Sequence, residues 1–139
     1  MFLLDTNVVS EMMKQEPDRQ VRRWFMQHRS NDMYISAITI GETVYGFHKM
    51  PDGKKKDRLS NWFEVEFLEW INDRIFPLGE SVLRDWAVVK AGNRTLPVVD
   101  SLIAATAIAA GATIVTRNVK DFEGIEGLAV INPWEQSAS

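Results

Sequence analysis

Short apolar runs of strand type alternate along this chain with longer segments of helical periodicity, and this alternation limits the possible folds. The strand-type runs are residues 2–4, 33–35, 74–78, 113–116 and 128–131. The helical segments are residues 6–14, 17–29, 36–50, 54–72, 80–93 and 97–110. Strands that alternate with helices form parallel sheets, because each crossover lays a helix on a face of the sheet. We therefore expect an α/β fold with a parallel β-sheet of four to five strands and helices on both faces.

Residues with strong positional preferences support several of these boundaries. Ser36 is a suitable N-cap for the helix that follows it, and Asp18 follows a proline at the start of another. Pro97 suits the first turn of a helix, and Gly111 suits its left-handed end.

The chain has 139 residues, of which 45% are hydrophobic and 25% charged, as in an ordinary globular domain. This length favours one domain with its own core. We expect that domain to span residues 1–134. We further expect the chain to be loose from Asn132 onward, and residues 135–139 to form a disordered tail.

Cysteine is absent, and the only histidines are His28 and His48, which narrows the possible chemistry. Thiolate nucleophiles, thiolate zinc sites and His-rich metal sites are excluded. A general base would be a carboxylate or a metal-bound hydroxide. No apolar run is long enough to cross a bilayer and no signal peptide is visible, so we expect a cytoplasmic protein without membrane contact.

Two acids stand at or just beyond the ends of predicted strands. Asp5 directly follows the apolar run Phe2–Leu4, and Asp121 lies in the loop after the run 113–116. Each has an ordinary explanation, since Asp5 could cap the next helix and Asp121 could be a turn residue. Thr6 and Asn7 can also cap that helix, however, and the carboxyl ends of parallel strands are where α/β sheets bind ligands.

Two further acids lie in predicted helices. Most helical glutamates are solvated, but the neighbours of Glu42 are small or apolar, which indicates a partly buried setting. Asp100 is the only charged residue from Pro97 to Ala112. The helix dipole alone could favour it in the first turn, yet an alanine-rich helix packs closely, so we expect Asp100 to face a cavity.

The four acids together make a stronger prediction than any one of them. Carboxylates from four segments in one crevice would form an oxygen-only site for Mg²⁺, which proteins hold with a few carboxylates and waters. The ion can activate a bound water and offset charge on a scissile phosphate. We expect Thr6 and Thr116 to orient that water by hydrogen bonding.

Four stretches that contain these acids resemble the sequence blocks of PIN-domain proteins, in particular the VapC or FitB-like toxins of bacterial toxin–antitoxin pairs. The stretches are residues 4–7, 36–42, 96–107 and 115–122. They occur in the family's order and at about its spacing, and the resemblance covers nearly the whole chain.

The resemblance implies a single PIN-like domain with Mg²⁺- or Mn²⁺-dependent endoribonuclease activity. It places the family's acids on Asp5, Glu42, Asp100 and Asp121, which would be both metal ligands and catalytic residues. Thr116 and Asn118 correspond to accessory positions of the family. Members differ between the Asn118-type and Asp121-type positions, so the identity of the fourth ligand stays open.

The resemblance also implies partners. Family members are commonly homodimers and are inhibited by a cognate antitoxin of the VapB or FitA type, whose C-terminal segment occupies the toxin's groove. RNA would be the substrate, and operator DNA would be bound only through the antitoxin.

Basic residues near the expected rim of the site are Lys14, Arg94, Arg117 and Lys120. We expect them to hold RNA phosphates without reading sequence. A chain of formal charge −3 would need such a local basic patch to bind a polyanion. The run 54–56 is either a solvated helix start or an extension of that surface.

The helix at 54–72 carries Trp62, Phe63, Phe67 and Trp70, which either form an exposed partner surface or pack into the core.

Two other classes of function compete with the nuclease. A non-catalytic PIN-like module would bind RNA or protein without cutting, but the intact acids argue against it. A receiver-type signalling domain would need paired acids after its first strand and a phosphoacceptor on a later strand, whereas Asp100 is expected on a helix.

Overall fold

A computed structural model describes residues 1–135 as a five-stranded parallel sheet with helices on both faces. The strands are β1 (Phe2–Leu4), β2 (Met33–Ser36), β3 (Ile75–Phe76), β4 (Thr113–Val115) and β5 (Ala129–Ile131). The α-helices are α1 (Thr6–Met12), α2 (Arg19–Gln27), α3 (Ala37–Lys49), α4 (Lys54–Asn61), α5 (Leu68–Ile71), α6 (Glu80–Gly92) and α7 (Val98–Ala110). Two short 3₁₀-helices, η1 (Ser30–Asp32) and η3 (Val119–Phe122), and a π-helical segment, η2 (Trp62–Phe67), complete the chain. The predicted fold class is confirmed.

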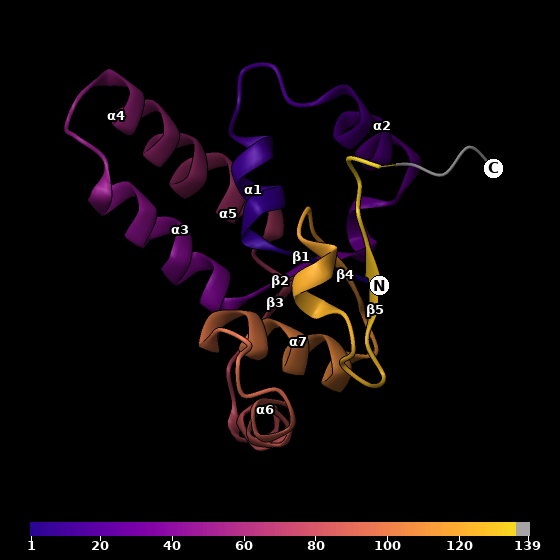
Figure 1. Cartoon of the computed structure of the whole chain (residues 1–139). Coiled ribbons are helices and arrows are strands. Elements are labelled where there is room, and N and C mark those ends of the chain that lie inside the picture. Colours follow the sequence, from indigo (N-terminus) through magenta and orange to yellow (C-terminus); the bar gives the residue numbers. More distant parts are fainter. Residues whose placement is uncertain (136–139) are drawn as a thin grey trace.

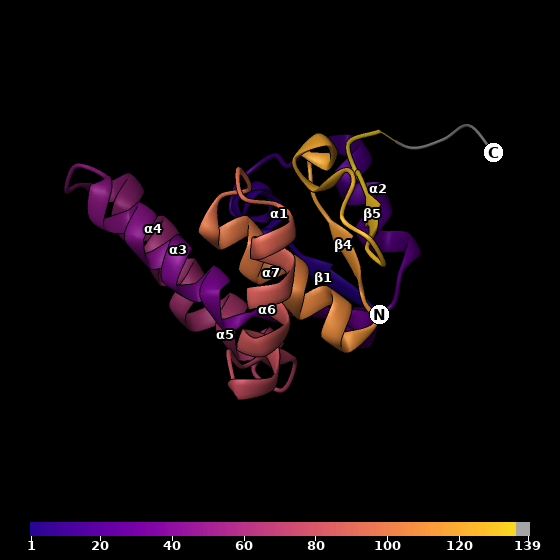
Figure 2. The same ribbon diagram turned by 60° about the horizontal axis from the view of Figure 1, so that its bottom comes forward.

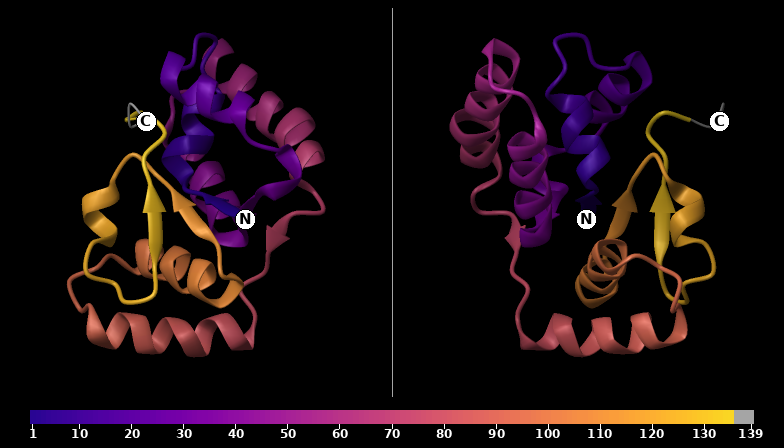
Figure 3. Two further views of the ribbon diagram at one scale, coloured as in Figure 1. Left: turned by 90° about the vertical axis from the view of Figure 1, so that its right-hand side faces the viewer. Right: turned by 60° about the vertical axis from the view of Figure 1, so that its left-hand side comes forward.

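The strand order is β3-β2-β1-β4-β5, and every pairing is parallel. From the central strand β1 the chain adds β2 and then β3 on one side of the sheet. It then crosses to the other side of β1, where it adds β4 and then β5, so the direction of strand addition reverses between β1 and β4. Such a reversal leaves a crevice at the carboxyl ends of the two strands, where α/β sheets bind ligands. Figure 3 shows β4 and β5 pointing the same way, with their carboxyl ends on the side of the sheet from which α1 rises.

Alternation along the strands builds two separate cores. Leu3 faces a core with α7 and η3, whereas Leu4 faces a core with α1, α2, α3 and the helical run of residues 54–71. The same alternation places Ile114 in the first of these and Val115 in the second. Successive side chains of a strand point to opposite faces, so three residues per strand suffice to hold both layers.

The helices on the two faces differ in arrangement. Figure 1 shows α3 and α4 as an antiparallel pair that extends away from the sheet, with α1 beside it. On the opposite face, α6 lies across α7 in Figure 2, so that α7 is sandwiched between the sheet and α6. The alanines of α7 allow this close packing, since Ala104, Ala105 and Ala107 are all at most 1% exposed.

Three predicted helix boundaries are confirmed by the local hydrogen bonds and backbone angles. The side chain of Asp18 accepts hydrogen bonds from the backbone of Gln20 and Val21, and that of Ser36 accepts one from Ile38. Gly111 ends α7 with a φ of 66°, a left-handed conformation that costs glycine little.

Two elements are shorter than predicted. The third strand was expected over residues 74–78 but contains only Ile75 and Phe76. Pro77 has no N–H to continue the ladder, and the side chain of Arg74 turns inward to bind three backbone carbonyls. Helix α1 ends at Met12, not Lys14.

The aromatic residues of the long helix belong mainly to the core. Phe63 and Phe67 are 0% and 2% exposed and stack on each other, which rules out an exposed partner surface for these two side chains. Trp62 and Trp70 are partly buried against the same core. The segment is π-helical, and this wider turn brings Trp62 over Phe67, five positions on, with ring centroids 5.4 Å apart.

The segment after β5 is held more firmly than predicted. Pro133 is buried, Trp134 packs against the core, and the side chain of Asn132 caps the backbone N–H of Trp134 at 2.8 Å. The expected looseness from Asn132 is therefore wrong for residues 132–134. Of the predicted tail, residues 136–139 lie outside the described part of the chain.

The uninterrupted α-helices are short, and α3, α6 and α7 have 13 residues each. A helix needs about 20 predominantly apolar residues to span a bilayer. Within residues 1–135, none meets the combined requirement of length and apolar character.

Candidate active site

The four predicted acids come from four elements that start at the same edge of the sheet. Asp5 directly follows β1, and Asp121 lies in η3, which follows β4. Glu42 lies in α3, which begins directly after β2, and Asp100 lies in the first turn of α7. Because α7 leads into the amino end of parallel strand β4, its own N-terminus returns to the carboxyl edge. The chain topology therefore directs all four toward the crevice at the strand reversal.

The electrostatics couple Asp100 to the other three acids. Burial, together with the charges of Asp5, Asp121 and Glu42, raises the pKa of Asp100 to about 6. The pKa of Asp5 is also raised, mainly by burial, with contributions from Glu42 and Asp121. These neighbouring charges disfavour the ionised forms of Asp5 and Asp100, and a bound cation would offset them.

Asp5 is held in place by hydrogen bonds to both carboxylate oxygens. Its Oδ1 accepts a bond of 2.8 Å from the backbone N–H of Thr6, and its Oδ2 accepts one of 2.8 Å from the Thr116 hydroxyl. The side chain is almost fully buried, at 6% exposed. These bonds favour the carboxylate and partly offset the burial that raises its pKa. Asp5 is also the N-cap of α1, a role that we expected Thr6 or Asn7 to take.

Thr116 and Asn7 hold the Asp5 side chain through hydrogen bonds to its carboxylate and to each other. The Asn7 amide donates to the Thr116 hydroxyl at 3.1 Å and to Asp5 at 3.4 Å, while its carbonyl oxygen accepts from the backbone of Arg117 at 3.2 Å. The backbone N–H of Asn118 also donates to the Thr116 hydroxyl at 3.1 Å. Sequence reasoning treated Asn7 only as a helix cap, although its position two residues after Asp5 was the available signal.

Thr6 joins the site through Glu42. Its hydroxyl donates a hydrogen bond of 2.6 Å to Oε1 of Glu42, across 36 positions of sequence. This bond links the first turn of α1 to α3 and orients the half-buried glutamate toward the crevice. Thr6 and Thr116, which the sequence analysis expects to orient a water, each donate directly to a carboxylate.

The loop after β4 contributes two neighbouring candidates for the fourth position. Asp121 is exposed, and its charge raises the pKa of both Asp5 and Asp100. Asn118 contributes its backbone N–H to the Thr116 hydroxyl. Asp121 is therefore coupled by its charge to Asp5 and Asp100, whereas neutral Asn118 could contribute only its amide oxygen, so both stay candidates for the fourth position.

The donor set fits a hard divalent cation, because it consists of carboxylate and hydroxyl oxygens only. No lysine or arginine of residues 1–135 forms an ion pair with any of the four acids. The four carboxylates are not yet arranged to coordinate a metal ion. The described residues contain no group of three or more acidic or histidine side chains spaced to hold one. Side-chain rotation toward a shared centre would be needed to ligate one.

The predicted basic residues occupy different surroundings. Lys14 pairs with Glu11 at 2.9 Å, and the Arg117 guanidinium lies 5.3 Å from the ring centroid of Trp134. Arg94 and Lys120 line one groove together with Asp121. Arg94, Lys120 and Asp121 thus share a surface, whereas Lys14 lies on a different one.

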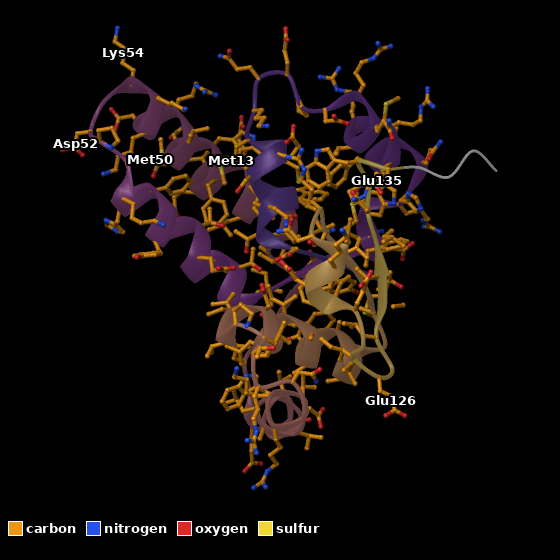
Figure 4. All side chains as sticks on the ribbon, viewed as in Figure 1. Met13, Met50, Asp52, Lys54, Glu126 and Glu135 are labelled. Carbon is orange, nitrogen blue, oxygen red and sulfur yellow. The ribbon has the colours of Figure 1, made fainter. Side chains whose placement is uncertain are left out.

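A second groove, of about 330 Å³, adjoins Glu42 and Thr6. Its apolar lining comes from α1, α3 and α4 through the side chains of Met13, Phe47, Met50 and Leu59. Figure 4 labels Met13 at the end of α1 and Met50 just after α3, and both line this groove. Lys14, Lys55 and Arg58 add positive charge to its lining.

Comparison with known proteins gives consistent relatives over nearly the full length. Residues 2–128 match the PIN domain family. The chain is 39% identical to VapC ribonuclease Y4jK of Sinorhizobium fredii, with 97% of this chain and 99% of that protein covered. It is 36% identical to toxin FitB of Neisseria gonorrhoeae, with 96% and 99% covered.

Solved structures give the same result. A structure of FitAB bound to an IR36 DNA fragment matches with a TM-score of 0.89 at 35% identity, covering 99% of this chain and 98% of that one. VapBC2 from Rickettsia felis, bound to a DNA fragment from its promoter, matches with a TM-score of 0.77 at 26% identity, covering 94% and 97%. By sequence and by fold, the chain belongs to the PIN-domain family.

Proposed function

We propose that this protein is a metal-dependent endoribonuclease and the toxin of a toxin–antitoxin pair. The observation that carries the proposal is that four acids come from four segments which the parallel topology directs to one edge of the sheet, and that Asp5, Glu42 and Asp121 all raise the pKa of Asp100. Asp5 is only 6% exposed, and an acid buried to this degree is costly without compensation, which a cation would supply in addition to its hydrogen bonds. Relatives named as VapC ribonucleases support RNA as the substrate.

The residues that would hold the cation are Asp5, Glu42, Asp100 and Asp121. When bound, Mg²⁺ or Mn²⁺ would lower the pKa of a coordinated water and offset the charge that develops on the scissile phosphate. Asp5 is the most firmly positioned of the four, because three donors restrain its carboxylate. Asp100 retains a pKa of about 6 in the apo site, so it is largely ionised at neutral pH.

The hydroxyl groups orient the acids by hydrogen bonding. Thr116 fixes the direction of Asp5, and Thr6 fixes that of Glu42. Partners of this kind hold ligand side chains in place and tune their basicity. Arg94 and Lys120 line a groove together with Asp121, where they would contact phosphates of an RNA strand that enters the site.

The partner that we propose is a cognate antitoxin. The solved structures that the chain resembles include FitAB and VapBC complexes, three of them bound to DNA. The apolar groove beside Glu42 suits an amphipathic segment of such a partner, since Met13, Met50 and Leu59 offer apolar contacts next to the acids. Operator DNA would then be bound through the antitoxin, and two toxin copies would assemble as a homodimer.

The decisive test is cleavage of total cellular RNA by purified, antitoxin-free protein in Mg²⁺, in Mn²⁺ and in EDTA. Asp100→Asn is the test variant, and Asp85→Asn on α6 is the matched control. We expect cleavage by the wild type and the control in either metal, and none in EDTA or with Asp100→Asn. A folded protein that binds Mn²⁺ but leaves all RNA intact would favour the non-catalytic binding module instead.

A further inference from the structure

Helix α2 and the residue pair that follows it concentrate positive charge in an acidic protein. Residues 19–29 contain four arginines, Arg19, Arg22, Arg23 and Arg29, and no acid. The whole chain carries a formal charge of −3. This segment was not among the RNA-contacting residues that the sequence suggested.

Three of these arginines share one outer face of the helix. Arg19, Arg22 and Arg23 line a shallow groove together with Met26 and Gln27. All three arginines are exposed, and Met26 is 81% exposed. None of the three forms an ion pair with an acid of residues 1–135. We call Arg19, Arg22 and Arg23 the arginine face.

Most of the charge of the arginine face works against the stability of α2, although the N-cap Asp18 stands four positions before Arg22. Arg19 and Arg23 are four positions apart and Arg19 and Arg22 three apart, spacings at which like charges repel. Arg19 also lies in the first turn, where the helix dipole disfavours a cation, and that turn contains no acid. Burial of Val21 and Trp24 holds the helix on the sheet despite this arrangement. The charge therefore fits an anion outside the domain.

Helix α2 packs into the same core as the segment that follows β5, which in turn contacts the candidate site. Trp24 and Phe25 pack into the same core as Trp134. The guanidinium of Arg117 lies over Trp134, and the backbone N–H of Arg117 donates to Asn7 beneath Asp5. Figures 1 and 2 both show α2 beside the segment that follows β5. Arg117 thus links Trp134 to the support of Asp5.

We propose that the arginine face of α2 binds the phosphate backbone of the RNA substrate outside the cleavage site, an inference that rests on the proposed ribonuclease function. Four carboxylates repel the polyanion at the point of cleavage, so affinity has to come from cations elsewhere. Guanidinium groups match phosphate oxygens through paired N–H donors. Phosphate contacts of this kind fix the position of RNA without reading its sequence.

The test measures binding of a fluorescein-labelled single-stranded RNA by fluorescence anisotropy in EDTA, over a series of salt concentrations. Arg22→Gln with Arg23→Gln is the test variant. Lys49→Gln with Arg84→Gln, on α3 and α6, removes the same charge elsewhere. Arg22→Lys with Arg23→Lys retains the charge and shows whether charge alone suffices. Circular dichroism verifies that each variant is folded.

We expect the glutamine variant to bind RNA about tenfold more weakly at 0.1 M salt. Its slope of log affinity against log salt should fall by about 1.4, or about 0.7 for each lost phosphate contact with a single strand. The control pair should change affinity less than about twofold. Equal losses in the test and control variants would overturn the proposal, because they would reflect net charge alone.

Two parallel measurements separate this inference from the proposed function. Cleavage by the wild type in Mg²⁺ with unchanged RNA affinity in the glutamine variant would reject the arginine face only. Affinity that depends on the arginine face without any cleavage would reject the ribonuclease and retain the RNA-binding surface. Loss of antitoxin binding with unchanged RNA binding would assign the face to the protein partner and overturn the proposal.

Discussion

The hydroxyl of Thr116 donates a hydrogen bond of 2.8 Å to the carboxylate of Asp5, joining residues 111 positions apart. The two residues follow β4 and β1, the adjacent strands between which the sheet order reverses. The same hydroxyl accepts from the Asn7 side chain and from the backbone of Asn118. One buried oxygen therefore connects the end of β1, the start of α1 and the loop after β4.

Replacing Thr116 by valine should weaken catalysis without unfolding the protein. Valine keeps the shape of the buried side chain but removes the bond to Asp5. Loss of a residue that orients a metal ligand typically costs about 10–100-fold in metal affinity or activity. Mn²⁺ titration and RNA cleavage rates would show the loss, and Thr116→Ser should restore most of it. Equal activity in the valine and serine variants would remove Thr116 from the orienting role.

Cation affinity should fall as the medium becomes acidic. The pKa of Asp100 is raised to about 6 by burial and by its acidic neighbours, so protons compete with the cation below this pH. We expect the apparent Mn²⁺ affinity to fall by up to about tenfold per pH unit below pH 6. Isothermal titration between pH 5 and pH 8 measures this. An affinity independent of pH over that range would exclude Asp100 as a ligand.

The apo protein should lose stability as pH rises toward neutrality. Because the folded pKa of Asp100 lies above its ordinary value of 3.8, its stabilising contribution is complete below that value and is lost as pH rises through about 6. Asp5 acts in the same direction. Asp100→Asn should therefore melt at a higher temperature than the wild type in EDTA at pH 7.5.

Divalent cation should reverse that loss in the wild type but not in Asp100→Asn. A ligand at one hundred times its dissociation constant stabilises a protein by about 2.7 kcal/mol. Mn²⁺ should thus raise the melting temperature of the wild type and of Asp85→Asn, and leave that of Asp100→Asn unchanged. An equal shift in all three proteins would place the cation away from Asp100.

Arg74 should be essential for folding and not for chemistry. Its guanidinium donates to the backbone carbonyls of Ser30, Met33 and Trp70, and the residue is 7% exposed. Arg74→Met would leave these acceptors unpaired and should cost about 3 kcal/mol of unfolding free energy. The exposed Arg84, changed to Met, should cost less than about 0.5 kcal/mol in the same denaturant titration. A loss as small in Arg74→Met would contradict the structural role.

The groove beside Glu42 should determine antitoxin affinity. Leu59 lines this groove, whereas Val65, on the same helical run, does not and is 60% exposed. We expect Leu59→Ser to weaken antitoxin binding by about tenfold, the scale of an interface contact worth 1–2 kcal/mol. Val65→Ser is the matched control, and equal affinity of both variants would locate the antitoxin elsewhere.

Much of this fold follows from patterns that act over a few residues. The caps at Asp18 and Ser36 and the glycine that ends α7 are local effects, and the sequence predicts them correctly. An acid at the end of an apolar strand is also a local pattern, and parallel topology then directs several such acids to one edge. The location of the site is therefore predictable even though the distances within it are not.

Other features depend on contacts between distant segments and were missed or predicted wrongly. The π-helical turn at residues 62–67 depends on how Phe63 and Phe67 stack within the core. The order of residues 132–134 depends on Trp134 reaching that core. The role of Asn7 depends on Thr116, which is 109 positions away. Patterns within a few neighbouring residues do not predict such contacts between distant segments.

The most direct test of the central claim is an anomalous-difference map from crystals of the protein soaked in Mn²⁺. We predict a peak among Asp5, Glu42, Asp100 and Asp121, at coordination distance from carboxylate oxygens of Asp5 and Asp100, and no such peak in Asp100→Asn crystals. A Mn²⁺ ion bound elsewhere, or the same peak in the variant, would contradict the assignment of these carboxylates as the metal site.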